Sequence, residues 1–252
     1  MRPIDTGRTL KTTDTSLRIV EALQDLQGAR VTEIAEHLDL SKSSVHNHLS
    51  TLRKRGYVVM EGDEYHPSLR FSNLGMYTRN RKDSYRRARG LAERLAEETG
   101  LDSDVIIEEN GRGIYLKTEA DNEDPNLFPH VGDRIYLHAI ATGKAILAEL
   151  PDRYVERVID HWGLPERTEN TITDPESLLT ELESVREQGY AFNRGENNAG
   201  IRAVGAAVHE PNGAVLGALS VSGPKYRMNG EWFERELPGT LLRFVDRFER
   251  EL

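Results

Sequence analysis

The segment VTEIAEHLDLSKSSVHNHLSTLRKRGYVV, residues 31–59, decides the fold of the N-terminal part of the chain. Its apolar residues recur at helical spacing and predict a short helix over residues 33–38, with Thr32 as the capping residue. A tight turn follows, and a second helix begins at Ser41 or Lys42 and ends before a glycine. Two helices joined in this way predict a helix-turn-helix.

The sequence on either side of this segment completes the motif. Before it, an apolar stripe at helical spacing predicts a helix from Thr15 to Gly28. After it, residues 57–60 and 65–66 predict two short strands around a turn at residues 61–64. Helix, helix, turn, helix and hairpin together predict a winged helix-turn-helix.

The triplet His-Asn-His at residues 46–48 raises the question of whether the second helix cuts DNA or reads it, because these letters name a family of metal nucleases. Helical geometry places the two histidines roughly 200° apart around the axis, so they cannot share one metal ion. The ββα setting of such nucleases is also missing from the predicted order. Val45, Leu49 and Leu52 form the inward stripe, and we expect the helix to read DNA.

The outward face of this helix carries short polar side chains flanked by cations, and no acidic residue occurs from Leu40 to Met60. A helix that enters the major groove needs small polar groups for base edges and cations for phosphates. The alternative is an ordinary solvated helix in a three-helix domain. The residues that we expect to contact DNA are Lys42, Ser43, Ser44, His46, Asn47, Ser50, Thr51, Arg53 and Lys54.

Composition and charge limit the possible functions. The chain has no cysteine, no apolar run of membrane-spanning length and no secretory signal, so we expect a cytoplasmic protein without disulfides. Residues 1–90 carry 16 Lys and Arg against 11 Asp and Glu, whereas residues 91–252 carry 17 against 31. A basic first third in an acidic protein indicates that this part alone meets a polyanion.

Two features concern salt. Arginine outnumbers lysine 26 to 7 in an acidic chain, as in proteins from salt-accumulating cells, although a GC-rich genome also raises the arginine content. The tip of the predicted wing, Glu61-Gly62-Asp63-Glu64, is acidic and would repel phosphates. Either the wing lies away from the DNA backbone or high salt screens the repulsion.

The rest of the chain predicts an α+β domain that follows a long polar helix over residues 68–100. The turn Pro211-Asn212-Gly213 joins the last two strands, and Pro238 is expected to break the final helix. The expected strands cover residues 105–110, 114–118, 190–193, 201–208 and 215–223, and the expected helices cover residues 138–150, 152–161, 177–189 and 232–252.

Three phrases of this second half are informative: LHAIATGKAILAEL (137–150), EQGYAFNRGENNAGIRAVGAAV (187–208) and GALSVSGPKYRM (217–228). They resemble the effector domain of IclR-type transcriptional regulators, and the winged helix ending in YHPSLRFSNLG (65–75) matches the DNA-binding half of that family. The resemblance covers nearly the whole chain from about residue 14. It implies a winged helix-turn-helix joined by a helix to a GAF-like domain that binds a small metabolite, in a homodimer or homotetramer.

We therefore expect a flexible arm at residues 1–13, a winged helix-turn-helix DNA-binding domain at 14–75, a linker helix at 76–90 and a GAF-like effector-binding and oligomerisation domain at 91–252. The expected function is that of a sequence-specific regulator that reads a near-palindromic operator in double-stranded DNA. An organic acid or a sugar-derived catabolite is the expected effector. In the alternative, the C-terminal domain only oligomerises and binds no ligand.

The resemblance also implies effector-binding positions, which are Ile135, Ala141, Thr142, Asn193, Ile201, Ala203, Ser220 and Ser222. The two serines are two residues apart on a predicted strand, so both hydroxyls point to one face, where packing within the sheet is their alternative role. Family members that bind small acids commonly carry an acidic residue where this chain has Asn193, and a thiol is known where it has Ala203. The effector of a relative therefore cannot be transferred.

Enzymatic and metal-binding interpretations fail on the residues present. TGKA (142–145) lacks the first glycine and the final Ser or Thr of a phosphate-binding loop, and neither Ser220 nor Ser222 lies in a Gly-x-Ser-x-Gly motif. His130 and His138 have carboxylates nearby, but solvated or packed histidines are the commoner case. We expect no catalytic residue, no cofactor and no metal ion.

Overall fold

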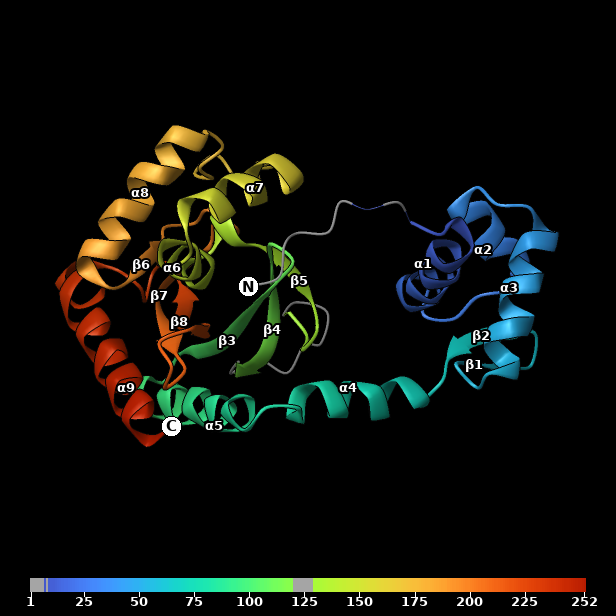
Figure 1. Cartoon of the computed structure of the whole chain (residues 1–252), viewed down its shortest axis with the longest axis horizontal. Helices are drawn as coiled ribbons and strands as arrows, with labels where there is room; N and C mark the ends of the chain where they lie inside the picture. Colours follow the sequence, from blue (N-terminus) through green and yellow to red (C-terminus); the bar gives the residue numbers. More distant parts are fainter. Residues whose placement is uncertain (1–6, 8, 120–128) are drawn as a thin grey trace. The chain divides into compact units, whose positions relative to one another are not determined.

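The computed structural model describes residue 7, residues 9–119 and residues 129–252. The chain divides into two compact units, of which the first ends at Asn80 and the second begins at Arg81 (Figure 1). Most of the arm expected at residues 1–13 lies outside the described residues. Helix α1 begins at Lys11, earlier than the expected Thr15.

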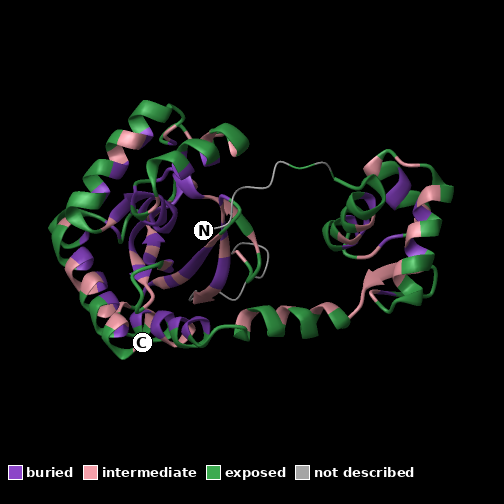
Figure 2. Cartoon of the chain, viewed as in Figure 1, coloured by how far each residue is buried: buried purple, intermediate pink, exposed green. Residues whose placement is uncertain are grey.

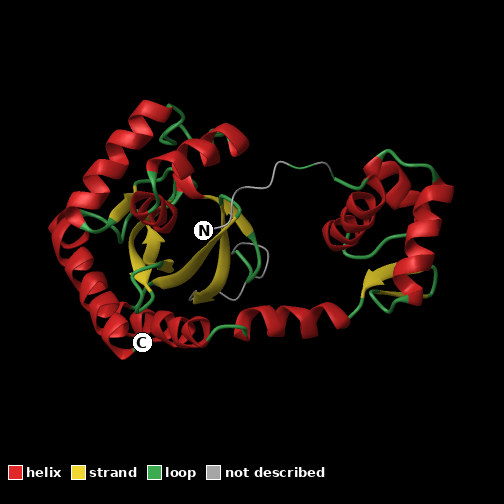
Figure 3. Ribbon diagram, in the orientation of Figure 1, coloured by secondary structure: helices red, strands yellow, loops and turns green. Residues whose placement is uncertain are grey.

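The N-terminal unit has packed helices followed by a two-stranded hairpin, which confirms the predicted order (Figure 3). Its core contains the fully buried side chains of Ile19, Leu23, Ile34, Val45 and Leu49. The elements are α1 (Lys11–Asp25), α2 (Val31–Leu38), α3 (Lys42–Lys54), β1 (Val58–Glu61), β2 (Glu64–Pro67) and α4 (Arg70–Asn80).

Local hydrogen bonds define where these helices begin. The hydroxyl of Ser41 accepts a hydrogen bond from the backbone N–H of Ser44 at 3.2 Å, and Ser41 is the N-cap of α3, one of the two expected starting residues. The expected cap at Thr32 is wrong. Helix α2 begins one residue before it, and the N–H of the preceding Arg30 donates to the Glu33 carboxylate at 2.7 Å.

The single polar helix expected to run through the linker at residues 76–90 is two helices, because the chain leaves α4 at Asn80 and enters α5 (Asp83–Thr99) after a break. Lys82 has an extended backbone, with φ −123° and ψ 142°. The guanidinium of Arg81 donates to the carboxylate of Glu109 at 2.9 Å. Arg81 and Lys82 thus belong to the second unit and interrupt the helix, which local sequence periodicity cannot anticipate.

The C-terminal unit is built on an antiparallel sheet whose strands follow the order β5-β4-β3-β8-β7-β6 in the described residues. The hairpin β7–β8, which turns at Pro211-Asn212-Gly213, is confirmed, and β3 and β4 form a second antiparallel hairpin. The strands are β3 (Asp102–Glu109), β4 (Arg112–Glu119), β5 (Arg134–Tyr136), β6 (Ala191–Asn193), β7 (Ile201–His209) and β8 (Val215–Pro224). This curled sheet with helices confirms the expected α+β class.

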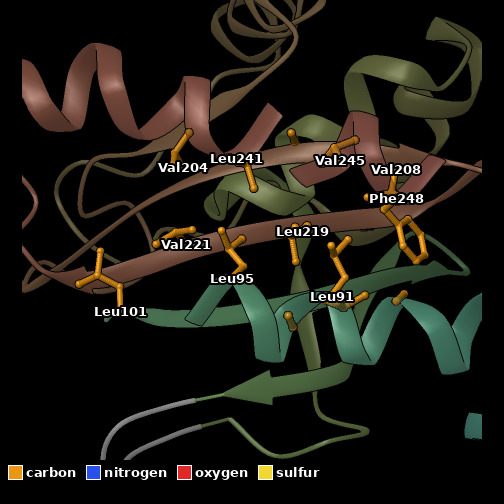
Figure 4. Packing of buried hydrophobic residues seen from close by; sticks show 14 of the residues in the cluster. Leu91, Leu95, Leu101, Val204, Val208, Leu219, Val221, Leu241, Val245 and Phe248 are labelled. Atoms are coloured by element: carbon orange, nitrogen blue, oxygen red, sulfur yellow. The ribbon is translucent and has the colours of Figure 1, made fainter. Parts of the chain in front are cut away.

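Helices α5 and α9 (Leu237–Glu251) pack on one face of this sheet, as the buried side chains show (Figure 4). Leu91 and Leu95 of α5 and Leu241 of α9 belong to one cluster with Leu219 of β8. Pro238, where a break was expected, lies in the first turn of α9, after a short π-helical segment η2 (Trp232–Glu236).

The opposite face of the sheet meets the remaining helices of the unit. Ile106 of β3 and Ala218 of β8 are buried in a second cluster with residues of these helices. The elements on this side are a 3₁₀ turn η1 (Leu137–Ala139), α6 (Ala141–Glu149), α7 (Asp152–Trp162) and α8 (Pro175–Gln188). Every side chain from Ala141 to Ala148 is buried, so α6 is the most enclosed of them (Figure 2).

Candidate DNA-reading helix and candidate effector site

Helix α3 has one buried face and one exposed face. Val45 and Leu49 are at most 1% exposed, and Leu52 packs against the same core. The predicted DNA contacts lie on the rest of the helix surface, where Ser44 is half-buried and the others are exposed, namely Lys42, Ser43, His46, Asn47, Ser50, Thr51, Arg53 and Lys54. The structure therefore gathers all nine predicted residues on the accessible side of α3.

The two histidines of the triplet have different surroundings. The ring Nδ1 of His48 is half-buried against α1 and lies 2.8 Å from the hydroxyl of Ser16, whereas His46 is exposed. Among the described residues, no group of three His, Asp or Glu side chains is placed to hold a metal ion. The His48 side chain thus contacts α1, whereas that of His46 is exposed on α3.

The acidic tip of the wing forms an ion pair within its own domain. The guanidinium of Arg30, just before α2, lies 2.8 Å from the carboxylate of Asp63 and 3.9 Å from that of Glu64. Both pairs are exposed and contribute little stability. They nevertheless direct negative charge of the tip toward Arg30, which reduces the repulsion that the tip would exert on a phosphate.

Six of the eight predicted effector residues meet where α6 begins over β6, β7 and β8. Strand register places Ser222 opposite Ala203, and Ala203 opposite Asn193. Two residues further along the same pair of strands, Ser220 lies opposite Gly205. Directly opposite residues in an antiparallel pair share a face, so these side chains line the side of the sheet that α6 covers.

Gly205 allows the first turn of α6 to approach the sheet. A Cβ atom at this position would lie 2.6 Å from the backbone nitrogen of Thr142 and 2.7 Å from the carbonyl carbon of Ala141. Any larger residue would therefore push the start of the helix away from β7. Ala141 and Thr142 are brought next to Ser220 in this way, since Ser220 is the β8 partner of Gly205.

The other two predicted residues lie further away. Ile201 is half-buried at the beginning of β7, opposite Pro224, on the same face as Ala203. Ile135 is on β5, and the sheet order places β4 and β3 between it and β8. Ile135 packs into the apolar cluster beneath α6, so the structure does not bring it to Ser220.

Asn193 is already occupied by hydrogen bonds within the chain. Its Oδ1 accepts from the N–H groups of Gly195 at 2.9 Å and Glu196 at 2.8 Å, and its Nδ2 donates to the carbonyl of Ala139 at 3.3 Å. The side chain is 5% exposed. Asn193 therefore holds the loop after β6 against the residues that lead into α6, whatever further contact it makes.

Lys144 was considered above as part of a phosphate-binding loop, and the structure gives it another role. Its ammonium is 1% exposed and lies 2.8 Å from the Glu181 carboxylate of α8 and 2.9 Å from that of Glu196. A buried ammonium paired with two carboxylates is not free to bind phosphate. The network fastens α6 to α8 and to the loop that Asn193 holds.

Asp104 was missed by the sequence analysis. It lies on β3 directly opposite Ser220 of β8 and Thr118 of β4, on the face that α6 covers. Burial raises the pKa of its carboxyl to about 7, and a hydrogen bond from Thr118 lowers it without cancelling that effect. The strand was expected to begin at residue 105, because Asp102, Ser103 and Asp104 are all polar and show no alternation that would extend it.

Tyr115 of β4 lies close enough to Asp104 for the two groups to interact electrostatically. Burial raises the pKa of its phenol, and the nearby carboxylates of Asp104 and Asp133 raise it further. The ring is 8% exposed and packs with Ile106 and the residues of α6. The phenol therefore stays protonated and can only act as a neutral hydrogen-bonding group beside the candidate site.

No helix among the described residues has the length and apolar character needed to cross a membrane.

Comparison with known proteins gives the same pattern for both units. The family described as "Bacterial transcriptional regulator IclR C-terminal" matches residues 77–247, and the "IclR helix-turn-helix domain" matches residues 12–62. The "Probable HTH-type transcriptional regulator ArcR" of Halobacterium salinarum is 32% identical over 94% of this chain and 92% of its own length. Both family descriptions and this relative concern transcriptional regulators rather than enzymes.

Solved structures share the fold. The IclR protein of Thermotoga maritima has 25% identity and a TM-score of 0.76, over 97% of this chain and 99% of its own. The inducer-binding domain of the Acinetobacter regulator PobR, a double mutant in complex with 3-hydroxybenzoic acid, has a TM-score of 0.60 at 22% identity. The match covers 66% of this chain and 97% of the PobR domain. At 22% identity this match is evidence for a shared fold only, and not for a shared ligand.

Proposed function

Because this chain belongs to the IclR family of DNA-binding transcriptional regulators, we propose that it reads a specific operator with α3 and that a small metabolite bound beneath α6 controls its affinity for DNA. The family establishes the class of protein. The operator, the effector and the residues that contact them are the proposal.

The exposed face of α3 supports the DNA-reading role. Asn47, His46 and the serines are short enough to reach base edges without clashing with the groove walls, and Lys42, Arg53 and Lys54 are exposed at its two ends. The guanidinium of Arg53 also lies 3.6 Å from the sulfur of Met60 on β1, toward the wing. Cations at both ends of a polar face suit a helix held between two phosphate strands.

The geometry beneath α6 supports the effector role and carries this part of the proposal. Ser220 is 4% exposed and Thr142 is 3% exposed, yet in the described part of the chain neither hydroxyl forms a hydrogen bond. Hydroxyls on residues of such low exposure, without a hydrogen-bond partner in the described part of the chain, can donate to and accept from a ligand.

We further propose a homodimer or homotetramer, four functional parts divided near residues 13, 75 and 90, and a cytoplasmic, salt-adapted protein. Helix α4 has no buried residue within this chain (Figure 2). Even its large apolar side chains are exposed, Met76 by 62% and Tyr77 by 72%. Apolar side chains that one copy leaves exposed are typical of a surface that a second copy covers. A two-fold dimer presents two copies of α3 to a near-palindromic operator.

Selection of bound fragments from the source genome tests the proposal. Purified full-length protein is mixed with sheared genomic DNA, and the retained fragments are sequenced. An enriched inverted repeat with half-sites about one helical turn apart is expected. Retention of fragments in proportion to their length alone would contradict sequence-specific reading. The selection is then repeated in the presence of a cell metabolite extract. A change in the enrichment of the inverted repeat would support control by an effector.

A further inference from the structure

The candidate effector site has a negative end at Asp104. The carboxyl group lies on the same face as Ser220, one strand away, with Asp102 two residues earlier on the same strand. Its partly buried position raises the free energy of the ionised form, which a cation placed beside it would lower. In the described part of the chain, no lysine or arginine forms an ion pair with Asp104. A bare carboxylate as ligand would be repelled from this end.

The opposite end of the site is positive, because it is the N-terminus of α6. The first amide of this helix that has a backbone partner is that of Lys144, which donates to the carbonyl of Ile140 at 3.0 Å. In the described part of the chain, the N–H groups of residues 141–143 form no hydrogen bond with another backbone group. Unpaired amides at a buried helix start attract a carboxylate.

The ammonium of Lys144 does not substitute for such a ligand. It points to Glu181 and Glu196, which neutralise it on the side of α8. The positive character of the helix start is therefore that of the amides. Between the two ends lie Ser220, which is 4% exposed, and Thr142, which is 3% exposed, and neither hydroxyl has a hydrogen-bond partner among the described residues.

Strand spacing gives the distance between the two ends. Neighbouring strands lie about 4.8 Å apart, so Asp104 is about one strand spacing from Ser220 and about two from Gly205, over which α6 begins. From these positions, and resting on the proposed effector function, we propose that the effector is a small amino acid. Asp104 binds its ammonium group, while the first turn of α6 and the hydroxyls of Ser220 and Thr142 bind its carboxylate.

This assignment narrows the expected class of effector. An organic acid without a positive charge satisfies the helix end of the site and meets repulsion at Asp104. A neutral sugar satisfies the hydroxyls and leaves both charged ends without a counterion. An amino acid carries one group of each charge, so it offers a counterion to each end of the site, and its ammonium favours the ionised state of Asp104.

Isothermal titration calorimetry on the full-length protein tests the assignment at about pH 8, above the pKa of Asp104. The common L-amino acids are titrated singly, each beside the carboxylic acid that lacks only the amine, such as propanoate for alanine and butanedioate for aspartate. At least one amino acid is expected to bind, and its amine-free partner is expected to bind at least about tenfold more weakly. Equal affinity for the two members of every pair would overturn the assignment.

Variants test whether Asp104 is the residue that binds the ammonium group of the ligand. Asp104→Asn is expected to weaken binding of the amino acid at least about tenfold and to strengthen binding of the amine-free acid, because it removes the repulsion, whereas Ser220→Ala weakens binding of both. Asp160→Asn, an exposed aspartate on α7, is the matched control and is expected to change neither. The comparison of ligands on the wild-type protein remains decisive if Asp104→Asn fails to fold.

The outcomes separate this inference from the proposed function. If an acid without an amine binds as tightly as its amino-acid partner and alters operator binding, the amino-acid assignment is wrong and the effector function stands. If no compound binds while operator binding is intact, the amino-acid assignment and the effector part of the proposed function are both contradicted, and the DNA-reading part stands.

Discussion

The ammonium of Lys144 and the carboxylate of Glu196 lie 2.9 Å apart, and both side chains are at least 93% buried. This pair connects α6 to the loop after β6, which the amide of Asn193 holds from the other side. The start of α6 is thus positioned by interactions that lie behind the candidate effector site. The position of α6 in the candidate site therefore depends on the Lys144–Glu196 pair, although this pair does not line the site.

Removing one partner of this pair should destabilise the C-terminal unit. Lys144→Ala leaves Glu196 buried without its cation, and the expected loss is about 3–5 kcal/mol of unfolding free energy. Urea unfolding followed by circular dichroism measures it. Lys117→Ala, which removes an ammonium that is 19% exposed near Glu93 and Glu119, is the control and should cost far less. Equal losses in the two variants would show that burial of the Lys144 pair has no special effect.

A methyl group at position 205 should disturb α6 and the effector site together. Gly205→Ala places a Cβ within 2.6 Å of the Thr142 nitrogen, and overpacking of this kind costs about 1–3 kcal/mol. Gly90→Ala in α5 is the control, because its Cβ would have nothing within 4 Å and alanine favours a helix. Thermal melts should show a lower Tm for the first variant and an unchanged or higher Tm for the second. A stable Gly205→Ala protein with unchanged ligand affinity would contradict the close approach.

The carboxyl of Asp104 should make stability depend on pH. Its pKa is raised from 3.8 to about 7 on folding, so the folded state holds the proton more tightly than the unfolded state. Stability attributable to this group is therefore present at low pH and is lost as pH rises from about 4 to about 7. Asp102, Tyr115 and Thr118 are the groups that face it.

Asp104→Asn removes this dependence and is expected to exceed the wild type by about 1–3 kcal/mol at pH 8, toward the lower end because the side chain is partly exposed. Urea unfolding of both proteins from pH 4 to pH 8 measures the difference. Curves that remain parallel across this range would mean that Asp104 titrates normally.

The helix-turn-helix could be predicted from sequence because its determinants are local. The spacing of Val45 and Leu49 defines the buried face of α3, and the capping serine and closing glycine define its ends. The break after Asn80 could not be predicted, since Arg81 is held by Glu109 on a strand far along the chain. The cap of α2 was assigned wrongly because a carboxylate at Glu33 competes with Thr32, and both choices are consistent with the local pattern.

The effector site was predictable only in part. The alternation of Ser220 and Ser222 placed both hydroxyls on one face, and the register of β7 and β8 supports that placement. Asp104 enters the same row through the pairing of β3 with β8, which joins residues more than a hundred positions apart. Asn193 was expected to face a ligand, but its bonds with Gly195 and Glu196 depend on the shape of the following loop, which no periodicity encodes.

The central claim is that the exposed face of α3 reads DNA bases, and the affinity of Asn47→Ala for the selected operator tests it most directly. Fluorescence anisotropy on the operator and on a scrambled duplex at one salt concentration gives both affinities. The account predicts a loss of about 1–3 kcal/mol on the operator and none on the scrambled DNA, with Gln24→Ala on the exposed side of α1 unchanged on both. Wild-type affinity of Asn47→Ala for the operator would contradict the account.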